Sequence, residues 1–298
     1  MKVALFSDVH AIPEIWDVIY AHMQTHHPDG YWCLGDIIGR GYNPIRMTQT
    51  LKLLYDSQPP EHQQAWVKGN HDLNITEGTF YVLDGKASNV MMNSRDLAID
   101  IWHHQRLVNG GRQDLLEWIA QLPVYAPNII PDTFAGVHAV HGRFVMTHDG
   151  LVDKHESVWE PCKDDAHIHD QVQTLTTFQN GTVPRIILNG HTHIPMIALY
   201  DATTQLVQRY NVTQAHTIHL GDKQTLVVNT GSVSFPRKDI NFPNATPNCA
   251  LYALLHFTSP DDVVVQFEYV RLPKDTLRIP HDYDEHYGGE LKGLCSHE

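Results

Sequence analysis

The chain has 298 residues, which is long enough to bury a substantial core as one large α/β domain or as two smaller ones. Its formal net charge of −13 argues against a general coat for DNA or RNA, because phosphate backbones are bound by clustered Lys and Arg. That charge still permits a small anionic substrate held by a local positive centre such as a metal ion. No run approaches the ~18 apolar residues of a membrane helix, so we expect no membrane contact.

The cysteines and the first residues predict a cytoplasmic protein. Cys33, Cys162, Cys249 and Cys295 are scattered without a C-x-x-C pair, which favours reduced thiols over a disulfide framework or a thiolate zinc site. The opening MKVALFSDVH reaches Asp8 before an apolar region of the length that a secretory signal needs.

Six short apolar segments each end in a polar or glycine-containing cluster, as strands buried on both faces of a sheet do. In chain order they are KVALF (2–6), YWCL (31–34), AWV (65–67), FVM (144–146), RIIL (185–188) and TLVV (225–228). Helical periodicity predicts helices over 12–23, 43–56 and 169–180. Two longer β-like segments, 249–257 and 263–272, flank SPDD and predict a hairpin.

Residues 74–122 contain no clear strand but two helix-like stretches, 88–108 and 111–123. We interpret 74–135 as a helical insertion that lies over one edge of the site. The chain shows no repeat, low-complexity block or long linker, which favours one domain over 1–275. The polar, Gly/His-rich residues 276–298 form a loosely held C-terminal tail in this interpretation.

Candidate ligands gather where the predicted strands end, and in open α/β sheets ligand sites form at the carboxyl ends of strands. These residues are Asp8, His10, Asp36, Asn70, His71, Asp72, His148, His191 and His193. They offer carboxylate, amide and imidazole donors without a thiolate, which suits Mn, Fe, Zn, Co or Ni better than a cysteine zinc site or an all-oxygen calcium site.

In this order the residues resemble the calcineurin-like metallophosphoesterase superfamily, whose pattern is D-x-H, G-D, G-N-H-[DE], H and G-H-x-H. The blocks stand here as Asp8-Val9-His10, Gly35-Asp36, Gly69-Asn70-His71-Asp72, His148 and Gly190-His191-Thr192-His193. NTGSVSFPR (229–237) is similar to a stretch of the small bacterial phosphoesterase branch, so the resemblance spans residues 1–272. It implies an α/β fold, a four-layer α/β/β/α sandwich of two mixed sheets flanked by helices, here with the helical insertion.

The resemblance also implies a site with two divalent transition-metal ions, drawn from Mn, Fe, Zn, Ni or Co. One ion would be held by Asp8, His10, Asp36 and His193, and the other by Asp36, Asn70, His148 and His191, with Asp36 bridging. A metal-bridging hydroxide would then attack phosphorus, because a metal pair activates water and stabilises charge on the phosphoryl group. His71 would protonate the leaving oxygen or steady the phosphoryl oxygens.

Several roles stay open at this point. Asp72 could orient the His71 ring or cap the following segment. Arg40, in GDIIGRG, could contact substrate together with Asn70, or form a surface ion pair; Gly39 stands where the protein phosphatase branch has a second aspartate. Asp149 could hydrogen-bond a ligating histidine or face solvent. The histidines outside the pattern are interpreted as surface, core or helix-end residues: His22, His26, His27, His103, His104, His138, His141, His216 and His219.

The leading hypothesis is a phosphoric ester hydrolase that acts on monoesters, on diesters such as cyclic nucleotides, or on protein-bound phosphate. A long loop and a negative surface favour a small substrate over a nucleic-acid polymer. The alternative, a non-catalytic binding scaffold with the same fold, predicts losses among the ligands or at His71. An amidohydrolase would place H-x-H on an early barrel strand, whereas here it comes fifth.

Overall fold

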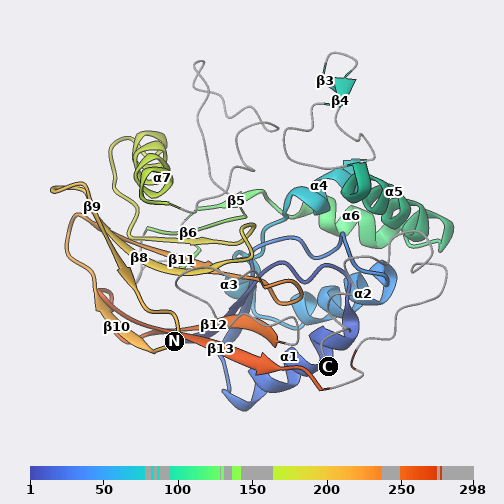
Figure 1. The fold of residues 1–298 in the computed structure, drawn as a ribbon, viewed down its shortest axis with the longest axis horizontal. Helices are drawn as coiled ribbons and strands as arrows, with labels where there is room; N and C mark the ends of the chain where they lie inside the picture. Colours follow the sequence, from blue (N-terminus) through green and yellow to red (C-terminus); the bar gives the residue numbers. More distant parts are fainter. Residues whose placement is uncertain are drawn as a thin grey trace.

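Two mixed β-sheets packed face to face form the centre of the protein in this computed structural model (Figure 1). The structure describes residues 1–77, 82–83, 86–87, 94–127, 129–130, 136–141, 164–236, 249–273 and 276. The first sheet has five strands, in the order β10 (His216–His219), β13 (Asp262–Arg271), β12 (Cys249–Phe257), β1 (Lys2–Phe6) and β2 (Gly30–Cys33). In it, β1 and β2 are parallel and the other pairs are antiparallel.

The second sheet has six strands, in the order β5 (Tyr125–Ala126), β6 (Val137–Val140), β7 (Ile186–Asn189), β11 (Gln224–Thr230), β8 (Pro195–Asp201) and β9 (Leu206–Tyr210). Its central strands β6, β7 and β11 are parallel. A separate short hairpin joins β3 (Val82–Leu83) and β4 (Lys86–Ala87).

Helices cover the outer faces of both sheets, as Figure 1 shows. Along the chain they are α1 (Pro13–Thr25), α2 (Pro44–Asp56), α3 (Pro60–Gln63), α4 (Asn70–Glu77), α5 (Ser94–Asn109), α6 (Gln113–Gln121) and α7 (Asp165–Phe178). Helices α1, α2 and α6 pack on the five-stranded sheet, whereas α7 packs on the six-stranded one. The layers are therefore α/β/β/α, which confirms the fold class.

The alternation of side chains along the strands explains these layers. In β1, Ala4 and Phe6 face the helices, while Val3 and Leu5 face the other sheet. Because successive strand side chains point to opposite faces, an unbroken apolar strand must be covered on both sides. Each fully buried large side chain of this kind contributes about 1.5–3 kcal/mol to folding.

Several sequence predictions are confirmed and others need correction. The strands at 2–6, 31–34, 185–188 and 225–228 are present, as are the hairpin and the predicted helices. The predicted strand 65–67 is reduced to one parallel bridge between Val67 and Leu34, because the chain enters α4 three residues later. The predicted strand 144–146 lies outside the described residues. Periodicity also missed β6 and β8 to β10.

The region predicted as an insertion contains the end of α4, all of α5 and α6, and also the β3–β4 hairpin and the short strand β5, which its sequence did not indicate. The domain boundary at residue 275 stays a prediction, and the tail 276–298 lies outside the described residues except for Thr276. In the described part of the chain, no helix combines the length and apolarity needed to cross a membrane. Cys33 and Cys249 are buried free thiols.

Candidate metal centre

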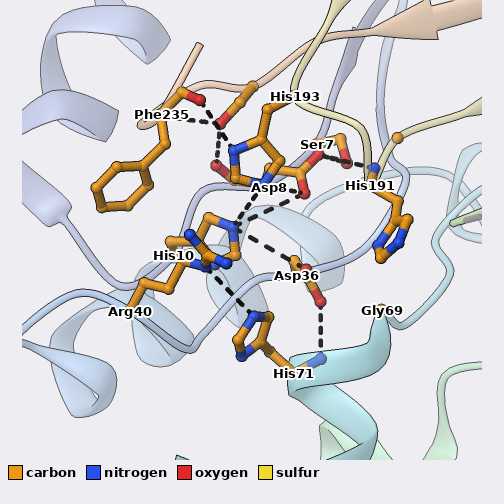
Figure 2. A network of polar contacts seen from close by, with 12 residues as sticks. Ser7, Asp8, His10, Asp36, Arg40, Gly69, His71, His191, His193 and Phe235 are labelled. Carbon is orange, nitrogen blue, oxygen red and sulfur yellow. Dashed lines mark hydrogen bonds and ion pairs between the residues drawn. The ribbon is translucent and has the colours of Figure 1, made fainter. Parts of the chain in front are cut away.

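Loops at the carboxyl ends of the strands bring several predicted ligands to one place, and Figure 2 shows Asp8, His10, His191 and His193 around Asp36. Asp8 and His10 follow β1, and Asp36 follows β2. The two loops are joined by backbone hydrogen bonds, in which the N–H groups of Asp8 and His10 donate to the carbonyls of Gly35 and Asp36, both at 3.0 Å. This pairing places the side chains of neighbouring parallel strands side by side.

The ligand loops have an unusual backbone. Asp8, His10, Asp36, His191 and His193 all have positive φ, at 56°, 52°, 52°, 71° and 60°. This left-handed region costs a non-glycine residue of order 1–3 kcal/mol, and it persists only where the surroundings enforce it. Strain concentrated in these residues indicates a functional site rather than ordinary turns.

Two glycines allow the loops to approach closely. A Cβ atom on Gly69 would lie 2.1 Å from Oδ1 of Asp36, and one on Gly190 would lie 1.9 Å from Oγ of Ser7. Any larger residue would therefore displace a strand end or a carboxylate. Because Gly190 has no side chain, the loop before His191 can pass close to Ser7 at the end of β1.

Asp8, His10 and His193 form the first candidate group for a metal ion. The Nε2 atoms of His10 and His193 are 3.2 Å apart, and Oδ1 of Asp8 is 3.2 Å from Nε2 of His193. Nδ1 of His193 lies 2.9 Å from the Phe235 carbonyl, to which it donates, so Nε2 keeps its lone pair. Burial holds the pKa of His10 well below its usual value, which keeps that ring neutral.

This first group fits a cation. Oδ1 of Asp8 is buried and has no hydrogen-bond partner among the described residues. A buried carboxylate oxygen facing the lone pair of an imidazole is repulsive unless a positive charge lies between them. The donor set, one carboxylate and two imidazoles, suits a divalent transition metal.

Asp36, His141 and His191 form the second candidate group. Nε2 of His141 lies 3.1 Å from Oδ2 of Asp36, while Nδ1 of His141 donates to the Leu34 carbonyl at 2.6 Å. Oδ1 of Asn70 lies 3.0 Å from Nδ1 of His191, so the amide oxygen joins the same group. Burial would lower the pKa of His141, but Asp36 outweighs it and raises the pKa to about 9. A proton thus joins this pair, and a bound cation would replace it.

Asp36 lies between the two groups. Its Oδ2 atom is 4.0 Å from Nε2 of His10 and 3.1 Å from Nε2 of His141, and its side chain is 2% exposed. Its Oδ1 atom accepts the backbone N–H of His71 at 3.0 Å. Burial alone would raise the pKa of Asp36, but the facing histidines hold it well below the usual value. Asp36 is therefore a member of, or adjacent to, both candidate groups, and its bridging role stays a prediction.

One ligand in this arrangement was not expected. His148 lies outside the described residues, as does Asp149, whereas His141 at the end of β6 is fully buried against Asp36. The prediction took 144–146 for the fourth strand and so read the next histidine as the ligand. The signal that could have identified His141 is its place directly after the short segment Val137–Val140, apolar except for His138, and directly before Gly142.

His71 contacts a carboxylate other than the expected one. Its Nδ1 atom lies 2.8 Å from Oδ1 of Asp100 on α5. Asp72 instead accepts the backbone N–H groups of Ile37, Ile38 and Gly69, at 3.2, 3.1 and 2.9 Å. The interpretation that Asp72 orients the ring is therefore corrected: Asp72 ties the start of α4 to the Asp36 loop. Burial would lower the pKa of His71, but Asp100 and Asp36 raise it to about 9.

Arg40 lies beside His71, in an ion pair that is largely buried. Its guanidinium is 3.1 Å from Oδ2 of Asp96, and its Nε atom is 3.4 Å from Nε2 of His71. Its side chain is 15% exposed, so it is not a surface arginine. His103 holds the loop on both sides of Arg40: Nδ1 accepts the N–H of Gly39 at 3.0 Å, and Nε2 donates to the Gly41 carbonyl at 2.7 Å.

Helix α5 therefore contributes Asp96, Asp100 and His103 to the site, at spacings of four and three residues along one helix face. Gly39 leaves room for this arrangement, since a Cβ there would lie 2.7 Å from Cβ of His71. The predicted insertion thus contacts the site through identified side chains, which sequence spacing alone did not reveal.

The NTGSV stretch supports the ligand loops. Nδ2 of Asn229 donates to the Gly190 carbonyl at 2.7 Å, and its Oδ1 accepts the N–H of Gly231 at 2.9 Å. Oγ of Ser232 donates to the Asp8 carbonyl at 3.0 Å. These residues act on the loops rather than on the space between the ligands, and Arg237 lies outside the described residues.

Comparison with known proteins agrees with this geometry. A model of the calcineurin-like phosphoesterase superfamily domain matches residues 1–250. A protein from Methanocaldococcus jannaschii, described as uncharacterized, is 25% identical over 239 residues, which cover 80% of this chain and 79% of that protein. The crystal structure of a metallophosphoesterase from Sphaerobacter thermophilus is similar with a TM-score of 0.61 at 19% identity, covering 99% of this chain and 100% of the other. A hypothetical protein from Pyrococcus horikoshii has a TM-score of 0.59 at 16% identity, with 97% and 98% of the two chains covered.

The chain belongs to the calcineurin-like phosphoesterase superfamily, because the family model spans most of its length. It is a hydrolase that acts on phosphoester bonds. The two solved structures share the fold across nearly the whole chain.

Proposed function

We propose that the protein is a dimetal phosphoester hydrolase. Asp8, His10 and His193 would hold one ion, and Asn70, His141 and His191 the other, with Asp36 shared by both. The observation that carries this proposal is the convergence of buried donors on both sides of Asp36. The retention of these donors and of His71 argues against the non-catalytic scaffold.

The metal pair would lower the pKa of a water molecule and neutralise charge on the phosphoryl oxygens. The mixture of nitrogen and oxygen donors without a thiolate suits Mn, Fe, Zn, Co or Ni, and we propose manganese or nickel as the most activating additions. Nδ1 of His193 donates to the Phe235 carbonyl, which leaves its Nε2 lone pair free for coordination, and burial favours the neutral form of His10 by lowering its pKa.

His71 would donate a proton to the leaving oxygen. His71 is 3% exposed, and its ring lies close to the Asp36 carboxylate and to Arg40. Its raised pKa of about 9 keeps it protonated near neutral pH, as a general acid must be before the transfer. Asp100 acts as a positioning residue, because it touches only the far nitrogen of the ring.

Arg40 would bind a non-bridging oxygen of the phosphoryl group. A planar guanidinium presents paired N–H donors that match two oxygens of one phosphate. Asp96 and His103 fix its direction, so little side-chain freedom is lost when substrate binds. A nearly buried arginine beside the centre favours a small phosphate ester over a polymer, in agreement with the net charge of −13.

A comparison of ester types under defined metals tests the proposal. The metal-free protein would be reloaded with Mn, Ni, Zn or Mg and assayed with p-nitrophenyl phosphate, bis-p-nitrophenyl phosphate and a phosphoserine peptide. We expect metal-dependent hydrolysis of at least one small ester, and a loss of about tenfold or more in Asp36→Asn. The exposed Asp222→Asn variant is the matched control. Activity that survives both metal removal and Asp36→Asn would disprove the proposal.

A further inference from the structure

Another group of possible metal ligands, separate from the two candidate groups around Asp36, lies at the end of α1. His22 and His26 come from the last turn and the C-cap of that helix, and Glu268 comes from the neighbouring strand β13. One donor atom from each residue lies within 4.8 Å of the others. All three side chains are partly buried.

The two histidines are four residues apart on a helix, which places both rings on one face. His26 keeps right-handed helical dihedrals, with φ −88° and ψ −5°, so this spacing holds up to the cap. The ring centroids are 5.3 Å apart. Paired imidazoles at this spacing can share one cation without a backbone change.

The contact between His26 and Glu268 is not a hydrogen bond. Nε2 of His26 lies 3.8 Å from Oε2 of Glu268, and this buried nitrogen has no hydrogen-bond partner among the described residues. Two donors on one tetrahedral ion at about 2.0–2.2 Å are separated by roughly 3–3.5 Å, so a small side-chain rotation suffices. A cation would satisfy a nitrogen that is otherwise left without a partner.

His22 is supported from behind. The hydroxyl of Tyr252 lies 2.8 Å from Nδ1 of His22, and Tyr252 is the cross-strand neighbour of Glu268. When Nδ1 donates to this hydroxyl, Nε2 retains its lone pair for coordination, which is the arrangement that orients metal-binding histidines. Tyr252 is fully buried, so it fixes the His22 ring relative to the sheet, while Nε2 of Gln266 donates to Oε1 of Glu268 and leaves Oε2 toward His26.

The group is separate from the catalytic centre. Nζ of Lys2 donates to the carbonyl of His26 at 2.9 Å, which places the group beside the start of β1, whereas Asp8 and His10 follow the end of that strand. Because the positive charge of Lys2 repels a cation, we expect metal to bind more weakly here than at the catalytic loops.

We propose that His22, His26 and Glu268 bind one divalent ion of the zinc, nickel or copper class, independently of catalysis. Two imidazoles and one carboxylate form a three-ligand site of the kind that zinc accepts, with a position left for water. The ion would join the end of α1 to strand β13 of the five-stranded sheet. Its expected effect is on stability rather than on turnover.

Metal content tests this directly. Protein equilibrated with micromolar Zn²⁺ and then desalted would be measured by mass spectrometry for bound metal. We expect His22→Gln, His26→Gln and Glu268→Gln each to bind one ion fewer per chain than the wild type. Each should also lose a zinc-induced rise in Tm of about 2–5 °C, with kcat on a phosphate ester unchanged.

His27→Asn is the matched control, because His27 is exposed beside His26 and its φ of 49° is one that asparagine tolerates. It should bind as many ions as the wild type. Circular dichroism confirms folding of each variant, and Glu268→Gln retains the size of the side chain if a histidine variant fails to fold. Equal metal content in the wild type and all three site variants would overturn the proposal, whatever the outcome for the catalytic metals.

Discussion

Asp100 accepts a hydrogen bond at 2.8 Å from a histidine 29 positions earlier, His71, and both side chains are almost fully buried. The pair joins helix α5 to the start of α4, where the backbone N–H of His71 is bound by Asp36. His71 is therefore held both through its backbone N–H and through its ring. This relationship yields the first prediction.

Asp100→Asn should make the rate more dependent on the leaving group. Without the carboxylate, His71 is a weaker proton donor at neutral pH, so kcat on an alkyl phosphate should fall by about tenfold or more. The p-nitrophenyl ester, whose leaving group needs little protonation, should lose much less. Asp114→Asn, on the exposed surface of α6, is the control. An equal loss on both esters would show that Asp100 has only a structural role.

His141→Ala should remove one of the two catalytic ions and most of the activity. The ring contacts Asp36 at 3.1 Å and is fully buried, so its loss also leaves a carboxylate oxygen without its partner. We expect about a hundredfold drop in kcat. Metal content and kcat of His148→Ala decide between the two candidate ligands. If only His148→Ala lost metal, His148 rather than His141 would be the ligand, as the sequence pattern predicted.

Gly69→Ala should disrupt the centre through its methyl group alone. The added Cβ would lie 2.1 Å from Oδ1 of Asp36, a distance that forces the carboxylate or the loop to move. Activity should fall by about tenfold or more, since small displacements of catalytic groups have effects of this size. Gly221→Ala, whose Cβ would lie 3.3 Å from a flexible glutamine side chain, should retain activity.

Arg40→Ala should raise KM for a phosphomonoester by about tenfold, the value of one hydrogen bond to a charged group. Asp96→Asn should act in the same direction, because it frees the guanidinium to turn away. Steady-state kinetics of the Arg40→Ala and Asp96→Asn variants, on a monoester and on a diester, measure the change in KM for each ester. An unchanged KM for every ester would restrict Arg40 to a structural ion pair.

Acid should destabilise the protein partly through His138. Burial lowers the pKa of this histidine to about 4 from 6.5, so between these values the unfolded chain binds a proton that the folded protein does not. With respect to this group, the free energy of unfolding is therefore highest above pH 6.5. It falls as the pH decreases toward 4, by up to about 3 kcal/mol. His138→Gln should reduce the slope of unfolding free energy against pH in this range. Identical slopes for variant and wild type from pH 4 to 6.5 would contradict the assignment.

The sequence predicted the parts of the site that lie in short local patterns. Asp8, His10, Asp36, His191 and His193 follow strand ends, and Asn70 begins α4 after the bridge at Val67; such points can be recognised from a few neighbouring residues. Two parts were not found in this way. His141 was missed because its strand, β6, contains a histidine and was placed later in the chain. Asp100 was missed because its contact with His71 depends on how α5 packs, which no local spacing encodes.

The side chains on one face of α5 bear on how the substrate preference of such an enzyme can change. The candidate metal ligands lie on strand-end loops and at the first residue of α4, whereas the groups that position the proposed proton donor and the arginine come from one helix. A sideways shift of α5, or its exchange for another segment, would change the leaving-group and phosphate preferences together. The proposed metal centre would keep its ligands, so selectivity can change without a change in the metal chemistry.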